Sequence, residues 1–309
     1  MAHRLVSLAL VAAIGSVEAR GQTIPERASG HLLIDAVAVD RAGMPVTDLR
    51  PEEFEVWIGG YRVPLTSLTA VTPAEDAARS IVLLLDDVTL DPVLVPRARE
   101  AARRFVSRMR PADQMTIVTL SGPSVESTGD RARLLRSLDA YNVRATAIMR
   151  VDTLSEHVLE TISSVSRQVA EARAHRKAIV AIGPAWLFDT PIPPPTIGRD
   201  LRREWTDAMR AMAFANVTLY VIDPGGVGGS RVNGGASGFA RETGGFTFSN
   251  TNDLNDAADR IMRETGTYYV IDVADPPVGR KSELRELDVR MLRRGVSVRA
   301  RRAIPGGRP

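Results

Sequence analysis

Apolar and polar residues alternate near both ends of the chain. The alternation is regular in 54–58, and Gly59-Gly60 directly after it marks a tight hairpin turn. Successive side chains of a strand point to opposite faces, so this period of two residues is typical of β structure. We therefore expect an N-terminal β segment in 30–72 and a C-terminal β segment in 267–303.

The middle of the chain, 78–266, follows a different pattern. Short, wholly apolar runs such as 81–85 and 178–182 are typical of strands that are covered on both faces. They alternate with segments whose apolar residues recur every three or four positions, as along one face of a helix. Strands and helices that alternate in this way form βαβ units. We predict an α/β domain with a doubly wound, mainly parallel sheet, and we expect the two flanking β segments to pair as a small β module.

Polar residues mark the expected starts of three helices. Asp130 and Asn252 each precede an apolar helical pattern and can act as N-caps. Thr153 and Glu156 have the spacing of a capping box, which predicts that a long helix opens there.

The first 19 residues have the features of a secretory signal peptide. His3 and Arg4 give a basic start, 5–14 is a short apolar core, and 17–19 fits a small-residue cleavage site. The core is short for a helix that spans a bilayer, so cleavage is favoured over the alternative of an uncleaved anchor. We expect an exported mature protein, either periplasmic or extracellular.

Composition narrows the possible chemistry. The hydrophobic fraction of 44% and the charged fraction of 25% are typical of globular proteins. Forty Lys and Arg against 37 Asp and Glu give a net charge of only +3, which argues against a dedicated nucleic-acid binder. The absence of cysteine excludes disulfides, thiolate catalysis and cysteine-ligated metals. With only four histidines and no catalytic constellation in the sequence, we predict that the protein is not an enzyme.

Several runs of residues have the character of family motifs. The most specific are V-D-x-x-G-x-P-V-x-x-L-x-x-E-x-F-x-V from 39 to 56, I-V-L-L-L-D-D at 81–87 and E-T-G-G-F-T-F at 242–248. The others are A-R-E-A-A-R-R-F-V at 98–106, V-I-D-P-G-G at 221–226 and Y-Y-V-I-D-V at 268–273. Together these runs resemble bacterial proteins related to the von Willebrand factor type A (VWA) domain. The resemblance spans nearly all of the mature chain and implies a Rossmann-like VWA domain in 78–266.

The resemblance also implies a metal site, because VWA domains carry a metal-ion-dependent adhesion motif, D-x-S-x-S, after the first strand, with a Thr and an Asp from later loops. This chain departs from that motif: counted from Asp86, the two serine positions are Val88 and Leu90. The later Asp, expected just after 178–182, is replaced by a glycine. The remaining candidate ligands for Mg²⁺ or Mn²⁺ are Asp86, Asp87, Thr89, Asp91 and Thr128.

Two interpretations of these residues remain open. One is a weakened, Asp-rich metal site. The other, which we favour, is that Asp86 and Asp87 cap neighbouring backbone groups, because too few ligands remain for the octahedral oxygen coordination that magnesium requires.

Ligands of open α/β sheets bind beyond the carboxyl ends of the strands. We therefore expect a non-enzymatic, adhesion- or scaffold-like module that binds a protein partner through this rim. The alternatives are a metal-dependent hydrolase that uses Asp86, Asp87 and Asp91, and a structural envelope protein that assembles through its β module. The rim residues expected to contact the partner are Ser121, Pro184, Trp186, Asp189 and Arg231.

The C-terminal β segment is rich in arginine, which could meet anionic envelope surfaces. Arg299 and Arg301 alternate there with Val298 and Ala300. This alternation favours the solvent face of a strand for both arginines.

Overall fold

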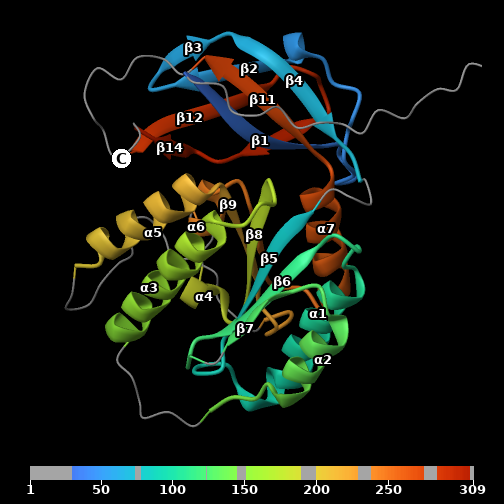
Figure 1. The fold of residues 1–309 in the computed structure, drawn as a ribbon, viewed down its shortest axis with the longest axis vertical. Helices are drawn as coiled ribbons and strands as arrows, with labels where there is room; N and C mark the ends of the chain where they lie inside the picture. Colours follow the sequence, from blue (N-terminus) through green and yellow to red (C-terminus); the bar gives the residue numbers. More distant parts are fainter. Residues whose placement is uncertain are drawn as a thin grey trace, which may run out of the picture.

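The computed structural model describes residues 30–73, 78–122, 124–144, 151–188, 200–228, 238–274 and 284–306. The expected signal peptide and two expected rim residues, Asp189 and Arg231, lie outside these ranges. Figure 1 shows the described residues as an α/β domain with two further sheets stacked above it.

A six-stranded sheet forms the centre of the α/β domain, with the strand order β10-β9-β8-β5-β6-β7. Its strands are β5 (Arg79–Leu85), β6 (Gln114–Thr119), β7 (Ser124–Thr128), β8 (Arg176–Ile182), β9 (Val217–Ile222) and β10 (Thr247–Phe248). β7 pairs antiparallel with β6, whereas the other pairings are parallel, so the sheet is mixed. Within this sheet the chain begins in the middle at β5 and continues through β6 to β7 at one edge. It then crosses to the other side of β5, where β8 lies. This is the order of a doubly wound sheet, and sheets of this kind bind ligands beyond the carboxyl ends of the strands at the switch point, which here falls between β5 and β8.

Helices cover both faces of this sheet (Figure 1). One face carries three helices, α1 (Val95–Ser107), α2 (Arg131–Ala140) and α7 (Leu254–Gly266). The other face carries two long helices, α3 (Val151–Ala170) and α5 (Arg202–Ala215), and two short ones, α4 (Ala185–Phe188) and α6 (Phe239–Glu242). Alternate residues of β5 enter the two cores: Leu83 packs on the α1 side and Leu84 on the α3 side. Burial on both faces accounts for the continuous apolar run in the sequence.

Strands from the two ends of the chain pair with one another in two four-stranded sheets. Their orders are β13-β1-β11-β4 and β14-β12-β2-β3. The strands are β1 (His31–Val39), β2 (Phe54–Ile58), β3 (Tyr61–Val63), β4 (Leu65–Val71), β11 (Tyr268–Ala274), β12 (Leu284–Met291), β13 (Ser297–Ala300) and β14 (Ala303–Pro305). The short 3-10 helix η1 (Pro51–Glu53) precedes β2.

β1 is buried on both faces because its sheet is the middle layer of the molecule (Figure 1). Ile34 packs in one core with Val56 of the second β sheet. On the opposite face of β1, Asp35 contacts Arg176, the first residue of β8. The β sheets therefore sit on the amino end of the six-stranded sheet, and its carboxyl end faces away from them.

Two of the expected helix starts need correction. Asp130 is confirmed as the N-cap of α2, since its side chain accepts the N–H of Arg133 at 3.0 Å. α3 begins at Val151, so Thr153 already lies inside the helix. The N-cap of α7 is Asp253, which accepts the N–H of Asp256 at 2.9 Å, rather than Asn252.

The expectation that Arg299 and Arg301 face solvent is wrong. Arg301 is 8% exposed and donates to the backbone oxygen of Ala213 at 3.1 Å. Arg299 forms an ion pair with the buried Glu264 of α7. The physical reason is the middle position of this sheet: its second face packs on the α/β domain and not against water.

Candidate functional site

Asp86 and Asp87 directly follow β5 at the switch point. The backbone N–H of Asp86 donates to the carbonyl of Ile182, the last residue of β8, at 3.1 Å. The next residue, Gly183, lies so close that a Cβ there would be 2.7 Å from the Cβ of Asp86 and 2.6 Å from a ring carbon of Phe188. Glycine at 183 thus allows the ends of β5 and β8 to approach each other.

The carboxylate of Asp86 is fully buried and holds the turn that follows β5. Its Oδ1 accepts the N–H groups of Val88 at 2.9 Å and Thr89 at 2.8 Å, and its Oδ2 accepts the Thr89 hydroxyl. Burial raises the pKa of Asp86 above its ordinary value, and the hydrogen bonds from Thr89 and Val88 offset this only in part. The hydroxyl of Tyr141 donates to the backbone oxygen of Asp86 at 2.6 Å, so the segment after α2 is attached to the same turn.

Asp87 connects the turn to the loop after β6. Its Oδ1 accepts the N–H of Ser121 at 2.8 Å, and its Oδ2 accepts the Ser121 hydroxyl. The Nε of Arg144 lies 3.7 Å from the same Oδ2, and the backbone N–H of Arg144 donates to the Asp87 carbonyl at 2.8 Å. Ser121 therefore lies at the carboxyl end of the sheet, where its N–H and hydroxyl hold Asp87 in place; its contact with a partner stays a prediction.

Thr128 and Asp91 do not join this pair of carboxylates. Thr128 is paired with Met115 at the amino end of β6, because β7 runs antiparallel and carries it away from the rim. Four residues of strand, roughly 13 Å, separate that position from the end of β6. Asp91 instead caps the 3-10 helix η2 (Pro92–Leu94) by accepting the N–H of Val93 at 3.0 Å. Thr128, expected as a candidate ligand of the same metal site as Asp86, therefore lies away from that site.

The residues at this end of the sheet do not fit a resident Mg²⁺ or Mn²⁺ ion. Both carboxylates are buried with their oxygens in internal hydrogen bonds, and the side chains of Val88 and Leu90 offer no oxygen ligand. A guanidinium already stands beside Asp87. Within the described ranges no group of three or more His, Asp or Glu side chains is placed to hold a metal ion. Octahedral coordination would require most of these hydrogen bonds to break.

A third buried aspartate, which the sequence analysis did not single out, follows a strand of the sheet and accepts backbone N–H groups. Asp223 follows β9 and is buried. Its Oδ2 accepts the N–H of Ala185 at the start of α4, at 3.0 Å, and its Oδ1 accepts the N–H of Gly225 at 2.8 Å. The signal that could have revealed it is its position at the end of an apolar strand, the same position that Asp86 takes after β5.

Three large apolar side chains are exposed on the loops that these aspartates hold. Trp186 of α4 follows β8 and is 42% exposed, Val93 of η2 follows β5 and is 73% exposed, and Val227 follows β9 and is 67% exposed. The side chain of Asn252 accepts hydrogen bonds from Arg97 at 3.4 Å and from the N–H of Val227 at 3.4 Å, which connects the β9 loop to α1. We call these three loops, with Trp186, Val93 and Val227, the apolar rim. Pro184, also expected there, is half-buried beside Trp186.

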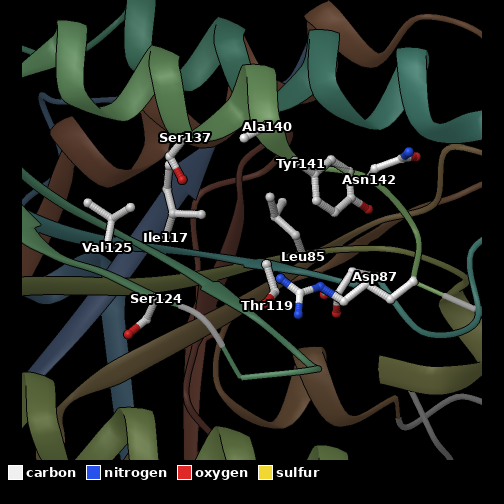
Figure 2. A pocket seen from close by; sticks show the side chains of 11 residues that line it. Leu85, Asp87, Ile117, Thr119, Ser124, Val125, Ser137, Ala140, Tyr141 and Asn142 are labelled. Atoms are coloured by element: carbon white, nitrogen blue, oxygen red, sulfur yellow. The ribbon is translucent and has the colours of Figure 1, made fainter. Parts of the chain in front are cut away.

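A pocket of about 160 Å³ opens next to the apolar rim, between β6, β7 and the end of α2 (Figure 2). Leu85, Ile117 and Val125 give it apolar walls. Thr119, Ser124 and Ser137 contribute hydroxyl groups.

No protein-family model matches the sequence, and a comparison with curated proteins gives no match. Among solved structures, the chain is similar to manganese-loaded Plasmodium vivax TRAP protein, at 11% identity and a TM-score of 0.42, over 76% of this chain and 96% of that one. It is similar to the human COPII-coat protein Sec24c at 10% identity and a TM-score of 0.38, over 77% of this chain and 44% of that one. The N-terminal domain of TFIIH p34 matches at 14% identity and a TM-score of 0.34, over 61% of this chain and 98% of that one. At these values none of them indicates a ligand or an activity for this chain.

Proposed function

We propose that this chain is an exported, non-enzymatic module of the VWA-like type that binds a protein partner across the apolar rim. The observation that carries this proposal is the exposure of Trp186, Val93 and Val227 on three loops that follow neighbouring strands. Tryptophan is among the residues that most often dominate the free energy of protein–protein binding. Exposed apolar residues on loops that follow three neighbouring strands, at the sheet end where α/β proteins bind their ligands, favour an interaction surface.

The three aspartates support the proposal because they hold the loops in place before binding. Asp86 fixes the turn after β5, Asp87 fixes the loop after β6, and Asp223 fixes the loops after β8 and β9. A surface that is already ordered loses less conformational entropy on association. The same hydrogen bonds occupy the oxygens that a metal-dependent hydrolase would need, which favours a binding role over catalysis.

Export is supported by the N-terminal sequence features alone. In the part of the chain that the structure describes, no helix is long and apolar enough to cross a membrane.

The test is affinity capture with the purified chain as bait and envelope extracts of the source cells as prey. Trp186→Ala is compared with Phe214→Ala, which removes an aromatic side chain of similar exposure, 45%, near the end of α5 just before β9, at the amino end of the six-stranded sheet. We expect a captured protein that is retained by wild type and Phe214→Ala and weakened about 30-fold by Trp186→Ala, the effect of a 2 kcal/mol hot spot. A set of captured proteins unchanged by Trp186→Ala contradicts the proposal.

A further inference from the structure

The pocket beside the apolar rim combines apolar walls with an exposed cation. Leu85, Ile117 and Val125 line one part of it, and the Arg144 side chain, 59% exposed, lines another. Figure 2 shows Ile117 and Val125 on one side and Asp87 and Thr119 on the other. A ligand that enters can therefore bury a short apolar group and meet a positive charge at the same time.

The ion pair between the Arg144 side chain and Asp87 is long. The 3.7 Å from its Nε to Oδ2 of Asp87 exceeds an ordinary hydrogen-bond length. A guanidinium carries two NH₂ groups in addition to Nε, and these can form a bidentate pair with a carboxylate. Asp87 lines the pocket but is only 1% exposed, and its carboxylate oxygens already accept both donors of Ser121.

The other polar groups of the pocket add hydrogen-bond donors. The side-chain oxygen of Asn142 accepts the N–H of Val143 at 3.0 Å, which leaves the NH₂ of Asn142 as the group that can serve a ligand. The hydroxyls of Ser124 and Ser137 can donate as well. These donors, together with Arg144, can serve an acceptor-only ligand group such as a carboxylate.

We propose that this pocket binds a single carboxylate group with a short aliphatic stem. The carboxylate pairs with Arg144, and the stem packs on Leu85, Ile117 and Val125. Arg144 is the one basic residue among the described residues that line the pocket, so the pocket offers one positive charge, which a monoanionic carboxylate can neutralise. The volume of about 160 Å³ corresponds to about five water molecules, which is enough for a short acid of about five or six non-hydrogen atoms.

The carboxylate can come from a free short-chain acid or from an Asp or Glu side chain of a bound protein. The second source rests on the proposed function, because it places an acidic residue of the partner beside the apolar rim. The first source is independent of that function.

The first experiment is a titration of the purified chain with sodium butyrate, followed by ligand-observed NMR, with butyramide as the uncharged analogue. We expect saturable binding of butyrate with a Kd on the order of 1–10 mM and no saturable binding of butyramide. Arg144→Gln should weaken butyrate binding at least tenfold, which corresponds to about 1.4 kcal/mol. Arg133→Gln, which removes an exposed arginine from α2 outside the pocket, should leave binding unchanged.

A second variant tests whether Arg144→Gln weakens binding only through a structural change. Ala140→Leu enlarges a side chain that lines the pocket and keeps the guanidinium, so it too should weaken butyrate binding at least tenfold. Equal butyrate binding by wild type and Arg144→Gln, or the absence of saturable binding in wild type, overturns the proposal.

The capture experiment with Arg144→Gln separates the two sources. Loss of the partner assigns the carboxylate to the partner's acidic side chain, whereas unchanged capture assigns the pocket to a free acid. Trp186→Ala should leave butyrate binding intact, because Trp186 does not line the pocket. Failure of the protein-binding proposal is thus distinguishable from failure of the carboxylate pocket.

Discussion

Asp35 of β1 and Arg176 of β8 form a buried ion pair, with 3.1 Å between Oδ2 and Nη1. The two residues are 141 positions apart in the chain. Oδ1 of the same carboxylate lies 2.9 Å from Nε2 of His175, and Asn216 donates to its Oδ2 at 3.1 Å. This cluster joins the middle β sheet to the α/β domain at the end opposite the apolar rim.

The first prediction concerns the strength of this connection. Asp35→Asn removes the charge and leaves the buried Arg176 guanidinium uncompensated, so the free energy of unfolding should fall by about 3–5 kcal/mol. Asp139→Asn is the matched control, because its ion pair with Arg103 is exposed and should contribute less than about 1 kcal/mol. Urea unfolding followed by circular dichroism measures both values. Equal losses for the two variants would show that the Asp35 cluster contributes no more than a surface pair.

The second prediction is the pH dependence of stability that Asp35 causes. Burial alone raises the pKa of Asp35, but the hydrogen bond and charge of His175, together with Arg176 and Arg301, outweigh it and hold this pKa below the ordinary 3.8. A carboxyl with a lowered pKa in the folded state contributes its full stability above pH 3.8, and this contribution is lost as the pH falls from there through the folded pKa. Wild type should therefore lose stability steeply below pH 4, and Asp35→Asn should show a shallower slope in the same range. Parallel curves in urea unfolding at pH 2.5–7 would contradict this.

The third prediction tests the close approach of β5 and β8. Gly183→Ala places a Cβ 2.7 Å from that of Asp86, and it should cost about 1–3 kcal/mol of unfolding free energy through overpacking. Gly129→Ala is the control, since its Cβ would meet neighbours only at 3.4 Å or more, and it should change stability by less than about 0.5 kcal/mol. Thermal unfolding of wild type and the two variants measures both changes in stability. A Gly183→Ala protein as stable as the control would mean that the strand ends are farther apart than described.

The fourth prediction is that the carboxyl end of the sheet holds no divalent ion. Calorimetric titration with Mg²⁺, Mn²⁺ or Ca²⁺ should show no saturable binding up to about 1 mM, because the oxygens of Asp86 and Asp87 are already occupied. Saturable binding that disappears in Asp87→Asn would contradict this prediction and would show that the metal site implied by the family resemblance is present.

The repeating patterns of the sequence predicted much of the architecture. The apolar run 81–85 predicted a strand covered on both faces, and β5 is buried throughout. The pair Gly59-Gly60 predicted a tight hairpin, which joins β2 to β3 with φ of 57° and 83° at the two glycines. These features depend on local geometry, which a short stretch of sequence contains.

Features that depend on distant neighbours could not be read from the same patterns. Alternation shows that Arg301 lies on one face of a strand, but not that the α/β domain covers that face. Nothing local indicates that β7 turns back and carries Thr128 to the amino end of the sheet. Arg144 follows α2 in a segment without periodicity, so its place beside Asp87 appears only in three dimensions.

The most direct test of the account is the affinity of a captured partner for three proteins, wild type, Trp186→Ala and Phe214→Ala, each measured with a chelator and with Mn²⁺. We expect the same Kd for wild type under both conditions, no change for Phe214→Ala, and a Kd about 30-fold higher for Trp186→Ala. Binding that requires the metal ion, or that survives Trp186→Ala unchanged, would contradict it.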